Sequence, residues 1–154
     1  MGEALKRRLQ QTRFEHPVQE ALLNLLVAAG HVRERMDRLY SGHDITPGQY
    51  NVLRILKGAH PRGYARCEIA RRMIERAPDL TRMIDRLQKR GLVERGRSDG
   101  DRRQSITRIT RKGMELVDAL RPTVAALHRE LSVRLTRRES AELSRLLEKV
   151  YGED

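Results

Sequence analysis

Residues 69–112, IARRMIERAPDLTRMIDRLQKRGLVERGRSDGDRRQSITRITRK, decide the fold. Apolar residues in the middle of this stretch recur at intervals of three and four, which is the spacing of one helix face: Leu80, Met83, Ile84 and Leu87. Gly91 follows at a position where helices commonly end on a residue with positive φ. The pattern predicts a helix that buries one face and ends just before Gly91.

A shorter helix is predicted immediately before this one, over Ile69–Glu75, with Arg76 and Ala77 as the turn. Pro78 suits the first position of the second helix, because its φ is fixed and its missing N–H is not needed there. The two segments together have the pattern of a helix–turn–helix.

A hairpin is predicted after the second helix, with strand candidates at Leu92–Arg95 and Ser105–Ile109. The residues between them include Ser-Asp-Gly-Asp at 98–101, a composition that favours a turn. Ile106 and Ile109 fall on opposite faces of the second strand, so the turn chemistry rather than the alternation predicts the hairpin. A helix–turn–helix followed by a basic hairpin is a winged helix.

Four segments resemble the multiple-antibiotic-resistance-regulator (MarR) family of transcription factors, and the likeness covers about residues 15–150. They are TRMIDRLQKRGLVER at 81–95, DRR at 101–103, ITRKG at 109–113 and TPGQYNVLRIL at 46–56. The resemblance implies a mainly α (α+β) winged helix–turn–helix, with long N- and C-terminal helices as a dimerisation domain. It also implies a DNA-binding regulator that acts more often as a repressor than as an activator.

Longer helices are predicted before the helix–turn–helix and after the hairpin, and capping residues mark several of their first turns. Their expected ranges are about 17–41, 46–59, 111–134 and 137–151, with Pro122 kinking the third. Capping boxes are expected at Thr46/Gln49 and Thr136/Glu139, and an N-cap at Thr110. We therefore divide the chain into a flexible N-terminal arm or helix extension (1–14), a helical dimerisation region (15–43 and 114–154) and a winged helix–turn–helix (44–113).

The outer helices carry more leucine than one monomer can cover, which favours a homodimer that buries the same surface from both subunits. The formal charge of +11 lies entirely in residues 54–112, which hold 18 Lys/Arg and 7 Asp/Glu. Charge concentrated in this way predicts a polyanionic partner, double-stranded DNA first. The alternative is a solubilising surface charge, which would not require concentration in one segment.

The DNA-binding candidates on the second helix are Arg82 and Arg86, which are four residues apart and share a face. Asp79 and Thr81 lie near the start of the same helix. An arginine fork matches two acceptors on a guanine edge, so this face could enter a major groove. The alternative is that one of the arginines pairs with a carboxylate, at Asp79, Asp85 or Glu75, or contacts phosphate.

Arg102 and Arg103 lie at the edge of the predicted hairpin tip, which is narrow enough to reach a minor groove. In the MarR family the aspartate of this motif holds an arginine in position, a role that the resemblance gives to Asp101 as wing support. The alternative is a solvated turn with a surface ion pair.

The resemblance to the MarR family also implies a small-molecule effector, which we expect to be aromatic or anionic. Its pocket is expected where the 17–41, 46–59 and 114–131 helices meet, and His31, Arg35 and Tyr50 would bring polar groups to apolar walls there. The alternative is that His31 and Arg35 are solvated and Tyr50 is ordinary core.

No cofactor, metal site or enzymatic activity is expected, because the histidines lack metal-site spacing and no nucleophile–base or phosphate-loop motif occurs. The chain also has no apolar run of membrane-spanning length, and its single cysteine, Cys67, fits a reducing cytoplasm. The function predicted is a cytoplasmic dimeric regulator that binds a pseudo-palindromic operator and responds to a small molecule. Two rivals remain: a sequence-neutral architectural DNA-binding protein of the same fold, and a winged-helix protein-interaction module.

Overall fold

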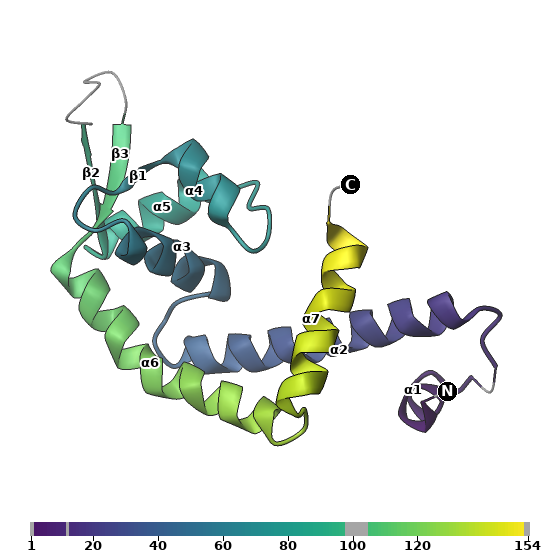
Figure 1. Cartoon of the computed structure of the whole chain (residues 1–154). Helices are drawn as coiled ribbons and strands as arrows, with labels where there is room; N and C mark the ends of the chain where they lie inside the picture. The colour runs from purple at the N-terminus through teal and green to yellow at the C-terminus, as the bar shows by residue number, and fades with distance from the viewer. Residues whose placement is uncertain (1, 12, 98–104, 153–154) are drawn as a thin grey trace. The chain divides into compact units, whose positions relative to one another are not determined.

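The computed structural model describes residues 2–11, 13–97 and 105–152, and in these ranges the chain is mainly helical (Figure 1). The chain divides into two compact units, residues 1–50 and 51–154. Among the described residues, none of the helices is both long enough and apolar enough to cross a membrane.

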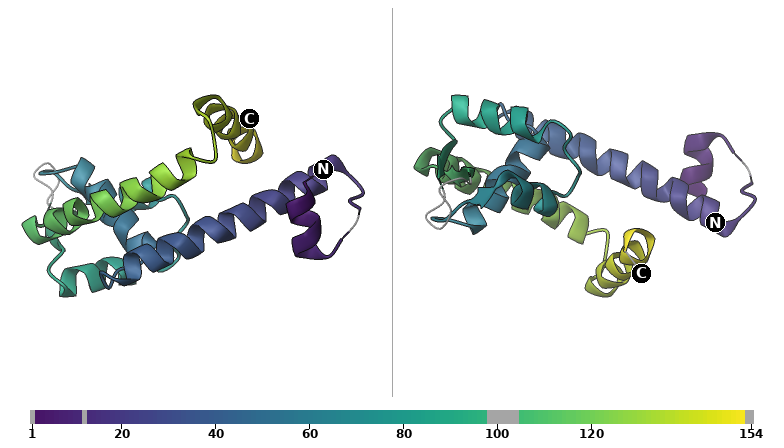
Figure 2. Two further views of the ribbon diagram at one scale, coloured as in Figure 1. Left: turned by 90° about the horizontal axis from the view of Figure 1, so that it is seen from below. Right: turned by 90° about the horizontal axis from the view of Figure 1, so that it is seen from above.

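The first unit contains α1 (Glu3–Leu9), α2 (Pro17–Ser41) and the first turn of α3 (Pro47–Gly58). Helix α1 was not foreseen as an element of its own. It lies at the N-terminal end of α2 (Figures 1 and 2), where the Gly2 N–H donates to Glu20 Oε1 at 2.7 Å. Leu5 is buried at 2% exposure, so an apolar side chain anchors this segment of the expected arm.

The turn between α2 and α3 is held by ring stacking and by the predicted capping box. Tyr40 stacks on Tyr50 with 4.6 Å between ring centroids, and both rings are buried. The Gln49 N–H donates to Thr46 Oγ1 at 3.2 Å, and the Thr46 N–H donates to Gln49 Oε1 at 3.0 Å. The reciprocal bonds satisfy two backbone donors that the first turn of a helix leaves open.

The second unit holds the winged helix. Its elements after α3 are β1 (Tyr64–Ala65), α4 (Arg66–Arg72), α5 (Leu80–Lys89), β2 (Val93–Arg97), β3 (Ser105–Ile109), α6 (Arg111–Ser132) and α7 (Arg137–Tyr151). The three strands form an antiparallel sheet in the order β1-β3-β2. Strand β1 was missed, because two residues are too few to show an alternating pattern.

The burial of the sheet explains why β3 lacked clean alternation. Ile106, Thr107 and Ile109 are all less than 9% exposed. Ile106 and Thr107 are adjacent and point to opposite faces of the strand, so both faces of β3 are covered and both its odd and its even positions can be apolar.

The first helix of the motif is shifted from the predicted range: α4 is Arg66–Arg72, not Ile69–Glu75. Met73 already has extended backbone angles, and the Ile74 N–H donates to Asn51 Oδ1 on α3 at 2.9 Å. This tertiary hydrogen bond favours the end of the helix at this point. It could not be predicted from the local sequence, because Asn51 lies 23 positions away.

The second helix begins two residues later than expected, because Pro78 lies in the preceding turn and Asp79 is the N-cap of α5. Three residues of its predicted buried face, Leu80, Ile84 and Leu87, are at most 2% exposed, whereas the fourth, Met83, is only partly buried. Gly91 follows with φ 71°, as expected for a helix stop.

Strand β2 starts at Val93 rather than Leu92, because the Leu92 N–H is used by the helix end. It donates to the Leu87 carbonyl at 3.0 Å, while the Gly91 N–H donates to that of Gln88 at 2.8 Å. These two bonds form a Schellman motif, which ends α5 and turns the chain into the strand.

Helices α6 and α7 start at their predicted caps. Thr110 Oγ1 accepts from the Gly113 N–H at 3.1 Å, and Thr136 forms a capping box with Glu139. Pro122 lies inside α6 as expected.

Helix α7 has no buried residue, and apolar side chains are exposed along it and along α2. They include Leu143, Leu146 and Val150 on α7 and Val18, Leu22 and Leu26 on α2. A single chain therefore leaves much of the apolar surface of these two helices uncovered.

Candidate nucleic-acid interface

The solvent-facing side of α5 carries the residues that the sequence predicted for DNA contact. Thr81, Arg82 and Arg86 are exposed, while the opposite side of the helix is packed in the core. Asp79 precedes them as N-cap and is also exposed, although its side chain makes no capping hydrogen bond. The structure thus places all four candidates of this helix on accessible surface.

The alternative that a carboxylate neutralises one of these arginines holds weakly for Arg82. Its Nη1 lies 3.7 Å from Asp79 Oδ2, and the two side chains are 77% and 75% exposed. An exposed pair at this distance contributes little, because water screens it. Arg86 is exposed and makes no ion pair with any of the described residues.

Asp85 pairs instead with Arg95, a residue that the sequence reading did not single out. Arg95 Nη2 on β2 lies 2.6 Å from Asp85 Oδ1 on α5, and both side chains are about two-fifths exposed. The pair therefore ties α5 to the strand that leads into the hairpin tip. The sequence offered only the opposite charges of these two residues as a signal. They are ten positions apart and do not have the spacing of neighbours on one helix.

Asp101, Arg102 and Arg103 lie outside the described residues. The strands on either side of them are described, and their register pairs Arg97 with Ser105 at the outer end. The two strands thus form the hairpin expected to support these three residues.

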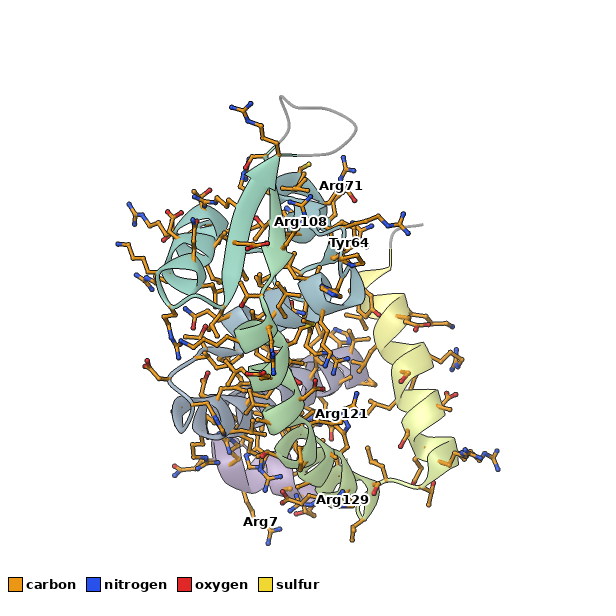
Figure 3. All side chains as sticks on the ribbon, turned by 90° about the vertical axis from the view of Figure 1, so that its left-hand side faces the viewer. Arg7, Tyr64, Arg71, Arg108, Arg121 and Arg129 are labelled. Carbon is orange, nitrogen blue, oxygen red and sulfur yellow. The ribbon has the colours of Figure 1, made fainter. Side chains whose placement is uncertain are left out.

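Further cationic and aromatic side chains lie on the sheet and beside it, where Figure 3 labels Tyr64 of β1, Arg108 of β3 and Arg71 of α4. The guanidinium of Arg72 lies 4.3 Å from the centre of the Tyr64 ring. Arg72 also hydrogen-bonds to Glu68, and this bond lowers the pKa of that carboxyl group. Glu68 is therefore an ionised partner for two arginines of α4, Arg71 and Arg72.

Three hydrogen bonds near the other end of α5 come from the start of α6. Lys112 Nζ donates to the Arg90 carbonyl at 2.9 Å, and Thr110 Oγ1 donates to the Gly91 carbonyl at 2.7 Å. The Thr110 N–H donates to the Leu92 carbonyl at 3.1 Å.

A pocket of about 240 Å³ lies between α3 and α6. Its lining is Arg54, Lys57, Gly58, Val117, Asp118 and Arg121, and Figure 3 marks Arg121 on α6. Lys57 Nζ lies 2.5 Å from Asp118 Oδ1, and this hydrogen bond lowers the pKa of the Asp118 carboxyl. With one carboxylate against three cations, the pocket carries a net positive charge.

The ligand candidates named from the sequence are not among these lining residues. His31 is exposed and Arg35 is partly buried, both on α2, while Tyr50 is buried and stacked on Tyr40. The sequence did not predict Arg54, Lys57 and Arg121 as site residues. These residues lie near one another only in the folded chain, where α3 and α6 line the same pocket.

The described part of the chain contains no group of three His, Cys, Asp or Glu side chains arranged to hold a metal ion. Cys67 is exposed and forms no disulfide.

The MarR family model matches residues 45–105, which span α3, the helix–turn–helix and the first two strands of the sheet. The multiple antibiotic resistance protein MarR of Escherichia coli is 32% identical over 138 residues, covering 84% of this chain and 94% of the relative. This chain belongs to the MarR family. It is a transcriptional regulator with the winged-helix fold.

Solved structures of transcriptional regulators agree with this assignment. A MarR transcription factor from Planctomyces limnophilus is 38% identical, with a TM-score of 0.67 over 88% of this chain and 98% of that one. A mutant of E. coli MarR bound to operator DNA is 30% identical, with a TM-score of 0.74 over 85% and 94%. The PcaV regulator of Streptomyces coelicolor with its natural ligand is 25% identical, with a TM-score of 0.67 over 80% and 88%.

Proposed function

We propose that this MarR-family protein is a homodimeric repressor that binds a pseudo-palindromic operator and releases it when a small organic anion binds. The observation that carries the DNA-binding part is the exposed arginine face of α5, within a segment that holds the whole net charge of the chain. The structure of E. coli MarR with operator DNA supports the proposal, since the two chains align over most of their lengths.

In this proposal α5 enters the major groove, with Arg86 and Arg82 as the base-reading residues. Arg86 is the stronger candidate, because Arg82 has a weak carboxylate neighbour in Asp79. Thr81 and Asp79 lie at the leading end of the helix and would contact base edges or phosphates. Arg102 and Arg103 would reach the adjacent minor groove, with Asp101 orienting them.

The exposed apolar residues of α2 and α7 support the homodimer. Leu143, Leu146 and Val150 are 44–59% exposed in a single chain, and fully burying a leucine stabilises a protein by about 1.5–3 kcal/mol. A two-fold partner would cover this surface and place one α5 helix on each half-site. A regulator of this kind acts on the chromosome, so we place the protein in the cytoplasm.

Selection of binding sites from a random DNA pool tests the proposal most directly. The expected product is a pseudo-palindrome whose half-sites lie one helical turn apart, roughly 10 bp between centres. Equal affinity for the selected site and for random DNA would favour the architectural DNA-binding protein instead. No binding to either DNA would favour the protein-interaction module.

The pocket between α3 and α6 is the proposed effector site, because Arg54, Lys57 and Arg121 line it against Asp118 alone. A carboxylate ligand would pair with the arginines, and Val117 offers an apolar contact for a ring. The structure of PcaV with its natural ligand supports a ligand-responsive function for the fold. We keep His31, Arg35 and Tyr50 as the secondary proposal for the helix junction expected from the sequence.

Calorimetry with salicylate as the probe tests this site, with and without the selected operator. Salicylate should bind the DNA-free protein more tightly than the operator-bound protein, by about 1–3 kcal/mol. By reciprocity, salicylate should lower the affinity for the operator by the same factor. Arg121→Met should abolish salicylate binding and spare operator binding, whereas Arg129→Met, on the same helix but outside the pocket, should change neither. Equal salicylate affinity in both titrations would remove the switch and leave the DNA-binding proposal standing.

A further inference from the structure

The start of α6 is bonded to the C-cap of α5 and to the two residues after it through consecutive carbonyl groups. Those of Arg90, Gly91 and Leu92 accept, in order, from Lys112 Nζ, Thr110 Oγ1 and the Thr110 N–H. We call these residues, 90–92 and 110–113, the α5–α6 junction. Because helix ends leave carbonyls without intrahelical partners, bonds of this kind connect one helix directly to the next.

Gly113 lets the two segments approach this closely. A Cβ at Gly113 would collide with the carbonyl oxygen of Leu92 and with the Ile109 side chain. The residue is buried, and its N–H donates to Thr110 Oγ1 at 3.1 Å. The hydroxyl of Thr110 therefore caps α6 while it also donates to the end of α5.

Lys112 contributes charge as well as a hydrogen bond. The C-terminal end of a helix carries partial negative charge, so an ammonium group at the Arg90 carbonyl is stabilising there. Its neighbour Arg111 behaves differently, because its guanidinium pairs within α6, with Glu115 Oε1 at 2.9 Å. Two adjacent cations on the same turn thus have separate partners, and of these two it is Lys112 that adds to the bonds of Thr110 between the helices.

We propose that Lys112 is a positioning residue for DNA binding, which holds α5 at a fixed orientation relative to α6 through the α5–α6 junction. This inference rests on the proposed function, in which α6 also lines the effector pocket. A rotation of α6 would then be transmitted to α5, and two α5 helices would match only one spacing of half-sites. In this proposal the Ile-Thr-Arg-Lys-Gly segment at 109–113 holds the end of α5 against the start of α6.

The test compares Lys112→Met with Arg111→Met, which removes the same charge from the neighbouring position, and with Lys112→Arg as the conservative variant. Operators are prepared with the selected spacing and with one base pair inserted between half-sites. In the wild type and in Arg111→Met, the inserted base pair should lower affinity strongly. In Lys112→Met this discrimination should shrink severalfold, and Lys112→Arg should restore it.

A phosphate-contacting lysine would give a different result. The salt slope of binding would then fall by about 1 per subunit in Lys112→Met, with unchanged discrimination between spacings, and that outcome would overturn the proposal. A parallel loss of affinity and of thermal stability, with the discrimination retained, would also overturn it, since Lys112 would then act only on folding.

Amide hydrogen exchange in the DNA-free protein supplies a readout that does not depend on the proposed function. The Gly91 and Leu92 amides belong to the α5–α6 junction, and they donate to the carbonyls of Gln88 and Leu87 at the end of α5. They should exchange faster in Lys112→Met than in Arg111→Met. Identical exchange in the two variants would rule out the positioning role even if the protein selects an operator. Faster exchange without any operator preference would refute the proposed function and leave the junction itself supported.

Discussion

Arg95 of β2 and Asp85 of α5 lie 2.6 Å apart, and this ion pair joins the second helix of the helix–turn–helix to the hairpin that follows it. Asp85 is adjacent in sequence to Arg86, the proposed base-reading residue. In the proposed DNA complex the helix and the hairpin contact neighbouring grooves, and this ion pair connects them next to the proposed base-reading residue.

Replacing Asp85 with Asn should therefore weaken operator binding more than it weakens folding. The pair is about two-fifths exposed, so its contribution to the free energy of unfolding should be within about 0.2–1 kcal/mol. A double-mutant cycle with Arg95→Met, followed by thermal melts and operator titrations, measures both effects. A coupling energy of zero in the operator titrations would show that the pair does not help to place the hairpin.

Arg86→Ala should reduce the difference between specific and random DNA by about 1–3 kcal/mol, the value of one bidentate base contact. Arg82→Ala should reduce this difference in affinity less than Arg86→Ala does, because Asp79 already lies near the Arg82 guanidinium. Competition binding with selected and random duplexes gives the comparison, and Arg111→Ala is the control because its side chain pairs within α6. Equal losses on both duplexes for Arg86→Ala would limit that residue to phosphate contact.

Arg102→Ala and Arg103→Ala should each lower the salt slope of DNA binding by about 1 per subunit, through the loss of a phosphate or groove contact. Their thermal stability should match the wild type, since a hairpin tip contributes little core. Titrations over a series of salt concentrations measure the slope. Wild-type slope and affinity in both variants would exclude the hairpin from the DNA interface.

Leu146→Asp should dissociate the proposed dimer, because a charge would be introduced into an apolar stripe of α7 that is 47% exposed in a single chain. Ser144→Asp is the matched control, since Ser144 is an exposed polar residue on the same helix. Light scattering at micromolar concentration reports the mass. A wild-type mass that is already monomeric would remove the dimer and the two-fold operator together.

Asp118→Asn should increase the affinity for salicylate, because it removes the carboxylate that pairs with Lys57 in the α3–α6 pocket. The lowered pKa of Asp118 means that this group is ionised at neutral pH. Its pairing therefore contributes at neutral pH and is lost as the pH falls through the lowered pKa of the folded state. Calorimetry at neutral pH should show tighter binding to Asp118→Asn, and weaker binding would place salicylate elsewhere.

Helix boundaries were predictable where capping residues and packing agree. Thr46, Thr110 and Thr136 all cap the helices that they were expected to start, and the range 17–41 predicted for α2 is the observed one. These signals are local, since each depends on side chains within four residues of the helix start.

The elements that were missed depend on contacts between distant residues. Asn51 ends α4 by accepting from the Ile74 N–H, 23 positions away, and β1 exists because Tyr64 pairs with Thr107. The pocket cations Lys57 and Arg121 are likewise far apart in sequence. The resemblance of the 81–95 segment predicted the fold class, and its helical period predicted the exposed arginines, but neither showed which carboxylate each arginine would meet.

The stacked pair of Tyr40 and Tyr50 makes the protein its own optical probe. The chain has no tryptophan and only four tyrosines, and this pair is buried at 2% and 7% exposure in the turn between α2 and α3. Tyrosine emission is therefore not masked by a stronger fluorophore. An opening of that turn would separate the two rings and expose them to water, so unlabelled protein could report it as a change in ultraviolet fluorescence.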